Sequence, residues 1–160
     1  MAERVIYGRK WNFRRHEPVY PISPTAAAAR DARGDHYAVA LAAPDGPPDA
    51  VIEVAWRQDH AGVWFLDAQG RQTLLYEFRR AGDRLFLHSV THWDYSLGGD
   101  GATRIDERRF REDGAVRRIV TDDDADDQVT EDDRDVDVSA HWEPVPRFGE
   151  WASLARRDRG

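Results

Sequence analysis

The dominant feature of the hydrophobic pattern is a proline-free stretch, residues 49–143, in which short apolar runs alternate with turn signals. All eight prolines lie outside it, at 18–48 or 144–146. The runs are rich in Val, Ile, Trp, Tyr and Phe, which are the residues that favour strands. Because proline cannot donate to a strand ladder, its absence over this length predicts a continuous β-sheet.

The alternation predicts about nine strands, spaced roughly 8–12 residues apart, as in meanders, sandwiches and barrels rather than βαβ units. Residues 59–62, 67–70 and 80–83 are expected to be turns, and residues 98–101 form a glycine-rich loop. The expected strands are Arg4–Phe13, His36–Ala43, Val51–Arg57, Val63–Leu66, Thr73–Arg79, Arg84–Tyr95, Arg104–Arg111, Ala115–Thr121 and Asp135–Glu143.

Two short helical segments complete the prediction. Thr25 is placed to cap a helical turn near residues 25–30, and residues 148–157 place Trp151 and Leu154 on one helical face. The whole chain, 1–160, is expected to form a single, mostly β domain. Its antiparallel meander should be closed or nearly closed, because closure removes exposed strand edges. This arrangement resembles the lipocalin-like (calycin) barrels at the level of fold, although the signature residues of that family are absent.

Composition excludes several classes of function. The chain has no cysteine, which excludes disulfides, thiolate metal sites and cysteine nucleophiles. It has no apolar run near 18 residues and no signal-peptide pattern, so we expect no membrane span and a cytoplasmic location. We also find no glycine-rich phosphate loop, no nucleophile elbow and no zinc-protease motif, and therefore expect no cofactor.

The net charge of −7 is concentrated in one segment. Residues 122–137 hold ten acids and a single base, Arg134, so the rest of the chain is slightly basic. This acidity disfavours a nucleic-acid partner. The segment faintly resembles a calcium-binding EF-hand loop through Asp122, Asp124 and Asp126, but Asp127 stands where that loop requires glycine.

The longest expected strand carries the first candidate chemistry. If the strand is regular, His88, His92 and Asp94 point to the same side, because residues two apart share a face. One histidine could then act as an acid–base group with Asp94 orienting it. A shared metal ion is disfavoured, because His88 and His92 would lie about 13 Å apart along the strand.

The alternation in residues 135–143 makes a second prediction. Val136, Val138 and Trp142 should face the core, which leaves His141 facing solvent.

The aromatic residues suggest a function. A barrel interior lined by aromatic rings and a few polar groups is typical of a small-molecule pocket. We therefore expect a hydrophobic or aromatic ligand, and the chain could be a cofactor-independent enzyme of the isomerase, cyclase or lyase type. Catalysis would use His88, His92 or Asp94 as the acid–base group and Tyr76 as a hydrogen-bond donor. The expected ligand-binding residues are Trp56, Trp64, Phe78, Phe86, Trp93 and Glu77.

Two alternatives remain open at this point. The first is an acidic protein-binding module, of the inhibitor or immunity type, that uses Asp122–Asp137 against a basic protein. The second is a metalloenzyme that uses the histidines.

Overall fold

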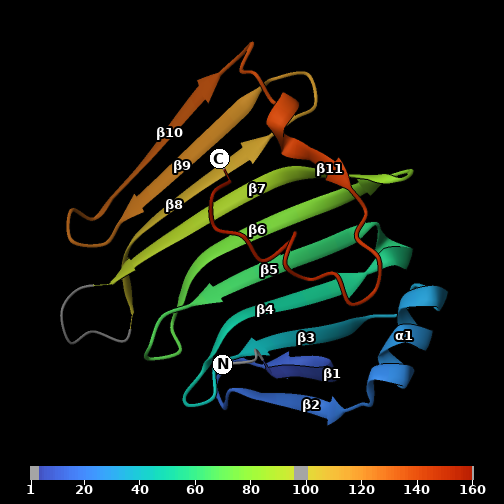
Figure 1. Ribbon diagram of the computed structural model, residues 1–160. Helices are drawn as coiled ribbons and strands as arrows, with labels where there is room; N and C mark the ends of the chain where they lie inside the picture. Colours follow the sequence, from blue (N-terminus) through green and yellow to red (C-terminus); the bar gives the residue numbers. More distant parts are fainter. Residues whose placement is uncertain (1–3, 96–100, 160) are drawn as a thin grey trace.

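A computed structural model describes residues 4–95 and 101–159 as one antiparallel sheet with a single α-helix (Figure 1). Three of the four residues of the predicted glycine-rich loop, 98–100, lie outside the described residues. The strand order is β10-β9-β8-β7-β6-β5-β4-β3-β1-β2, and β11 pairs with β7. The strands are β1 (Arg4–Asn12), β2 (Glu17–Pro21), β3 (Tyr37–Ala42), β4 (Pro48–Ala55), β5 (His60–Leu66), β6 (Gln72–Ala81), β7 (Arg84–Tyr95), β8 (Ala102–Phe110), β9 (Val116–Asp122), β10 (Asp127–Asp133) and β11 (Trp142–Pro144).

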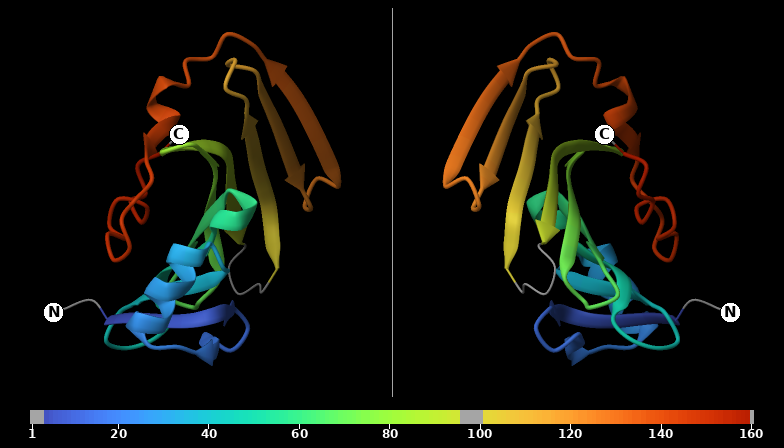
Figure 2. Two further views of the ribbon diagram at one scale, coloured as in Figure 1. Left: turned by 90° about the vertical axis from the view of Figure 1, so that its right-hand side faces the viewer. Right: turned by 90° about the vertical axis from the view of Figure 1, so that its left-hand side faces the viewer.

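The meander is confirmed, but the sheet does not close. The strand order ends at β10 on one side and at β2 on the other, with no pairing between them, so a barrel is not confirmed. Figure 2 shows the sheet as a strongly twisted surface from which β8, β9 and β10 curve away. The fold is therefore an open, coiled sheet.

Helix α1 (Pro24–Arg33) confirms the helical prediction near residues 25–30 and extends it. The cap is Ser23 rather than Thr25: its side chain accepts a hydrogen bond from the Ala26 amide at 3.1 Å. Pro24 occupies the first turn, where its missing N–H costs nothing. Gly34, with φ of +79°, ends the helix in the left-handed conformation that glycine adopts without strain.

The central strands bury both of their sides, and the larger core lies on what we call the inner face. We define the inner face by Val39, Ile52, Val63, Tyr76 and Leu87, which belong to one buried cluster. Helix α1 contributes Ala27 to this cluster. The opposite, outer face carries a smaller cluster of strand residues: Trp11, Ala38, Ala40, Val51 and Leu66.

The C-terminal segment lies across the inner face, where a barrel would have its lumen (Figures 1 and 2). Residues 148–157 form turns rather than the predicted helix. Trp151 and Leu154 nevertheless pack in the core, and the Trp151 indole donates to the Tyr7 hydroxyl at 3.1 Å. The buried Arg159 forms an ion pair with Glu143. Tertiary packing thus fixes this segment without regular helical hydrogen bonding.

An extra residue in β7 divides the pairing of that strand. Glu77 pairs with Ser89 while the next residue, Phe78, pairs with Leu87, so His88 is inserted as a β-bulge. After the bulge, β8 pairs with residues 89–95 of β7. Before the bulge, β11 pairs with residues 84–86 along the same edge of β7.

The predicted strand Asp135–Glu143 is wrong over most of its length. Only Trp142 and Glu143 belong to a strand, β11, and Ser139–His141 forms a short 3-10 helix. His141 does not face solvent: it is buried, and its Nδ1 lies 2.9 Å from the Leu87 carbonyl. That carbonyl is free to pair because β8 has left β7 at the bulge.

The acidic segment is a strand hairpin rather than a loop. A short turn, residues 123–126, joins β9 to β10, and all seven residues of β10 are exposed. The twelve positions of the supposed calcium-binding loop are therefore split between a turn and an extended strand, so the resemblance to an EF-hand is wrong.

Among the described residues, no helix is long and apolar enough to cross a membrane.

Replacing Leu154 by Ala tests whether the C-terminal segment is part of the core. Leu154 is fully buried, so we expect a loss of roughly 2–5 kcal/mol in the free energy of unfolding, measured by urea denaturation. The exposed Glu150→Ala in the same segment should change this free energy by less than about 0.5 kcal/mol. Equal effects of the two substitutions would contradict the packing described here.

Candidate functional site

The β7 bulge separates the predicted catalytic residues. Val90 belongs to the inner core, so His92 and Asp94, two and four residues further on, follow it on the inner side. His88 and Ser89 oppose Glu77, and in a bulge of this type all three side chains share one side of the sheet. The prediction that His88 shares a face with His92 and Asp94 is therefore wrong.

Several of the predicted ligand-binding side chains, and the predicted catalytic Tyr76, are packed against other parts of the chain. Phe78 and Phe86 are fully buried. Tyr76 is also buried, and its hydroxyl donates to the Arg157 carbonyl at 2.8 Å. Trp56 donates from its indole to the Asp31 carboxylate at 2.9 Å. These four side chains hold the helix, the strands and the C-terminal segment together.

The remaining two predicted aromatic residues meet on the outer face. Trp64 of β5 and Trp93 of β7 flank β6, and their rings stack with centroids 5.8 Å apart and planes inclined by 26°. Phe13, from the turn after β1, packs against Trp64 with ring centroids 5.2 Å apart. All three side chains are half-buried, so each ring keeps a surface in contact with solvent.

A row of polar positions crosses the outer face next to this aromatic stack. Strand register places Glu53, Gly62, Glu77 and Ser89 side by side on β4, β5, β6 and β7. Gly62 lacks a side chain, and the ring of His60 occupies the space beside it: its Nε2 lies 3.4 Å from where a Cβ would stand. The row and the stack together form what we call the outer site: Phe13, Trp64, Trp93, Glu53, His60, Glu77, His88 and Ser89.

The polar groups of the outer site are incompletely paired. Among the described residues, Glu77 forms no hydrogen bond or ion pair, but its charge acts on the His88 ring. The buried Ser89 hydroxyl has no hydrogen-bond partner. Glu53 meets only His36, at 3.2 Å. Buried polar groups are nearly always satisfied, so the unpaired Ser89 hydroxyl marks this part of the outer face as a candidate binding site.

Burial lowers the pKa of His88 below its usual value. The nearby Glu77 carboxylate opposes this shift, while Arg79 and His60 reinforce it. His88 is therefore neutral near pH 7, and one of its ring nitrogens can accept a hydrogen bond.

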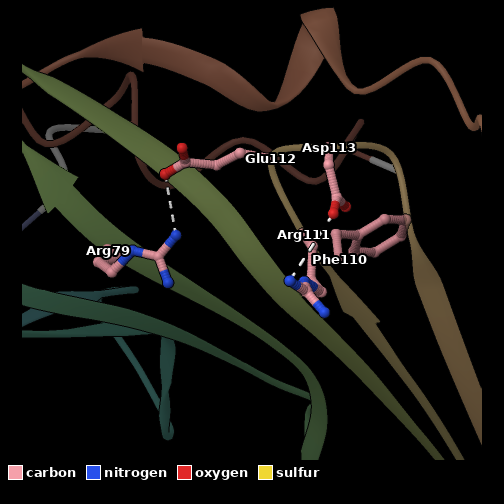
Figure 3. Close-up of a pocket in the computed structure, with 5 residues that line it drawn as sticks. All are labelled: Arg79, Phe110, Arg111, Glu112 and Asp113. Carbon is pink, nitrogen blue, oxygen red and sulfur yellow. Dashed lines mark hydrogen bonds and ion pairs between the residues drawn. The ribbon is translucent and has the colours of Figure 1, made fainter.

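A hollow of about 370 Å³ lies at the Arg79 end of the outer site (Figure 3). Arg79 is the register partner of His60, and its guanidinium donates to Glu112 of the β8–β9 turn at 2.9 Å. The lining residues are Arg79, Phe110, Arg111, Glu112 and Asp113. Four of the five lining residues are charged, and none of them belongs to the outer site as defined above.

Sequence reasoning missed Gly62, His60 and Ser89. Residues 59–62 look like a turn, but the turn ends at Asp59, which has φ of +52°, and β5 begins at His60. A glycine inside a strand often marks a place where another group approaches the backbone closely, and this signal could have singled out Gly62. No signal in the sequence predicts the bulge that places Ser89 on the outer side of the sheet.

The metalloenzyme alternative gains no support. Within residues 4–95 and 101–159, no three His, Asp or Glu side chains are placed to share a metal ion.

The environment of His88 predicts how its pKa responds to substitution. Glu77→Gln should lower the pKa of His88 further, because it removes the carboxylate that favours the protonated ring. Arg79→Gln should raise it, because it removes a repelling positive charge. NMR titration of the His88 ring measures both shifts, and His92 on the other face is the internal control. A pKa that rises in Glu77→Gln would contradict the arrangement.

Comparisons with protein-family models, curated proteins and solved structures give no match to this chain.

Proposed function

We propose that the chain binds a small molecule with a planar hydrophobic or aromatic ring, and that the ring packs on the outer face. The observation that carries this proposal is the half-exposed stack of Trp64 and Trp93, extended by Phe13. A lipocalin-like ligand would occupy the inner face, but the C-terminal segment already fills that side with Trp151 and Leu154. On the outer face, the half-buried Trp64–Trp93 stack keeps aromatic surface in contact with solvent.

Aromatic stacking supplies the affinity in this proposal. Large rings contribute most of the apolar area at binding surfaces, and offset stacking adds roughly 0.5–1.5 kcal/mol beyond area burial. The polar row beside the stack provides orientation, as the few polar groups of small-molecule sites generally do. The same row would provide the acid–base group if the chain catalyses an isomerase-, cyclase- or lyase-type reaction, with neutral His88 in that role.

Replacing Trp93 by Ala tests this proposal. With 2-naphthol as a neutral planar probe, we expect Trp93→Ala to weaken binding about tenfold or more, because roughly 1.4 kcal/mol of stacking and burial is lost. Calorimetry measures the affinity. Trp56→Phe is the matched control, because Trp56 belongs to the inner side and should leave the affinity unchanged. Equal affinities of the wild type and Trp93→Ala would end the proposal.

A second candidate function is contact with a basic protein through the β9–β10 hairpin. The specific observation is that β10 ends the sheet with every residue exposed, and four of its seven residues are acidic: Asp127, Glu131, Asp132 and Asp133. A strand edge offers free backbone groups, and its acidity favours association with a partner of opposite charge.

Neutralising the turn tests this second candidate. Replacing Asp123, Asp124, Asp126 and Asp127 by Asn should slow association with a nona-arginine peptide and flatten its salt dependence, because electrostatic steering is weakened. Stopped-flow measurements at low and high salt report both effects. The control variant neutralises four acids elsewhere: Asp45, Asp49, Asp83 and Asp113. If both variants behave alike, net charge explains the binding and the hairpin is not a site.

A further inference from the structure

We infer that the outer site selects a ligand that carries an amine, with its ring on the Trp64–Trp93 stack and its ammonium group against Glu77 and Ser89. This inference rests on the proposed function and adds the chemical class of the ligand.

Three hydrogen-bond acceptors on the outer face match the three donors of a primary ammonium group. They are the Glu77 carboxylate, the Ser89 hydroxyl opposite it and the ring of the bulged residue His88. Ser89 is 3% exposed, and its hydroxyl has no partner among the described residues. An ammonium group that donates to Glu77 and Ser89 would satisfy both groups, and each charge-assisted bond is stronger than a neutral one.

The charges around the site favour a cation over an anion. The guanidinium of Arg79 is paired with Glu112, and that of Arg109 is paired with Glu107. Glu77 has no cationic partner in the described chain, and Glu53 meets only the imidazole of His36. A ligand carboxylate would therefore add a negative charge beside an unpaired one, whereas an ammonium group would compensate it.

The spacing suits a ring joined to an amine by a short linker. Register pairs Trp64 with Leu75 and Gly62 with Glu77, so Trp64 and Glu77 are diagonal neighbours, which on a sheet lie roughly 7–8 Å apart. Gly62 itself contributes no side chain there, and the His60 ring and Leu75 border the position that its Cβ would take, at 3.4 and 3.8 Å. Indole faces also attract cations, which adds to the preference for an ammonium group near the stack.

Three indole probes that differ only in the side chain test the inference. Tryptamine carries an ethylammonium group, indole-3-propionate carries a carboxylate on a linker of similar length, and indole carries neither. We expect tryptamine to bind about tenfold or more tightly than indole-3-propionate, because one charge-assisted hydrogen bond is gained. Calorimetry gives the affinities, and the indole N–H signals of Trp64 and Trp93 in NMR spectra locate the probe.

The Glu77→Gln variant tests whether Glu77 causes the preference for tryptamine. This variant should bind tryptamine no more tightly than it binds indole. The matched control is Glu131→Gln, which removes one carboxylate from the exposed strand β10 and should retain the preference for tryptamine. Thermal unfolding curves confirm that both variants are folded.

The outcomes distinguish a failure of the amine inference from a failure of the proposed function. If indole shifts the Trp64 and Trp93 signals but indole-3-propionate binds as well as tryptamine, the amine inference is wrong and the aromatic site stands. A preference for tryptamine that survives in Glu77→Gln also overturns the inference. If none of the three probes shifts these signals, the proposed function itself fails.

Discussion

The insertion of His88 into β7 is the constraint on which the rest of the structure depends. A strand with regular pairing would keep β8 beside it along its whole length. Because the bulge interrupts the ladder, β8 separates after Ser89, and the Leu87 carbonyl instead meets His141. This gives β11 its place beside β7 and starts the C-terminal segment on its path across the inner face. A bulge increases local twist, which agrees with the way β8, β9 and β10 curve away in Figure 2.

The path of the C-terminal segment decides which side of the sheet is available to a ligand. Tyr7 and Tyr37 pack against Trp151, and the Tyr76 hydroxyl holds the backbone at Arg157. The inner face is therefore a core in the ordinary sense. The same bulge turns His88 and Ser89 to the outer face, next to Glu77. The β7 bulge thus accounts both for the C-terminal segment that packs on the inner face and for the polar residues His88 and Ser89 of the outer site.

An open sheet must protect its two edges from pairing with other chains. The β2 edge contains Pro18 and Pro21, which cannot donate hydrogen bonds, and the β10 edge is strongly acidic. Both devices are known to prevent association between strand edges. The acidity of β10 consequently has a structural explanation that competes with partner binding. Amine binding at the outer site depends on neither explanation, because Glu77 and Ser89 lie on central strands.

The sequence by itself predicted the antiparallel meander and most of its strands, but it missed β2 and β10 and wrongly extended a strand over residues 135–141. Its alternating and apolar runs placed β7 at Arg84–Tyr95 and β1 from Arg4 onward, because these signals are local and strand propensity agrees with them. It also pointed to Trp64, Trp93, Glu77 and His88 as candidates, although for an interior rather than an outer site.

Tertiary structure alone decided the side on which each candidate lies. A single inserted residue reverses the facing of every later side chain, and His88 becomes a bulge only because β6 and β8 pair with β7 in one particular register. The same holds for residues 135–143. Their alternation predicted a strand, but only Trp142–Pro144 pair with β7 in the structure. Register and sheet closure depend on contacts between distant parts of the chain, which a local pattern does not contain.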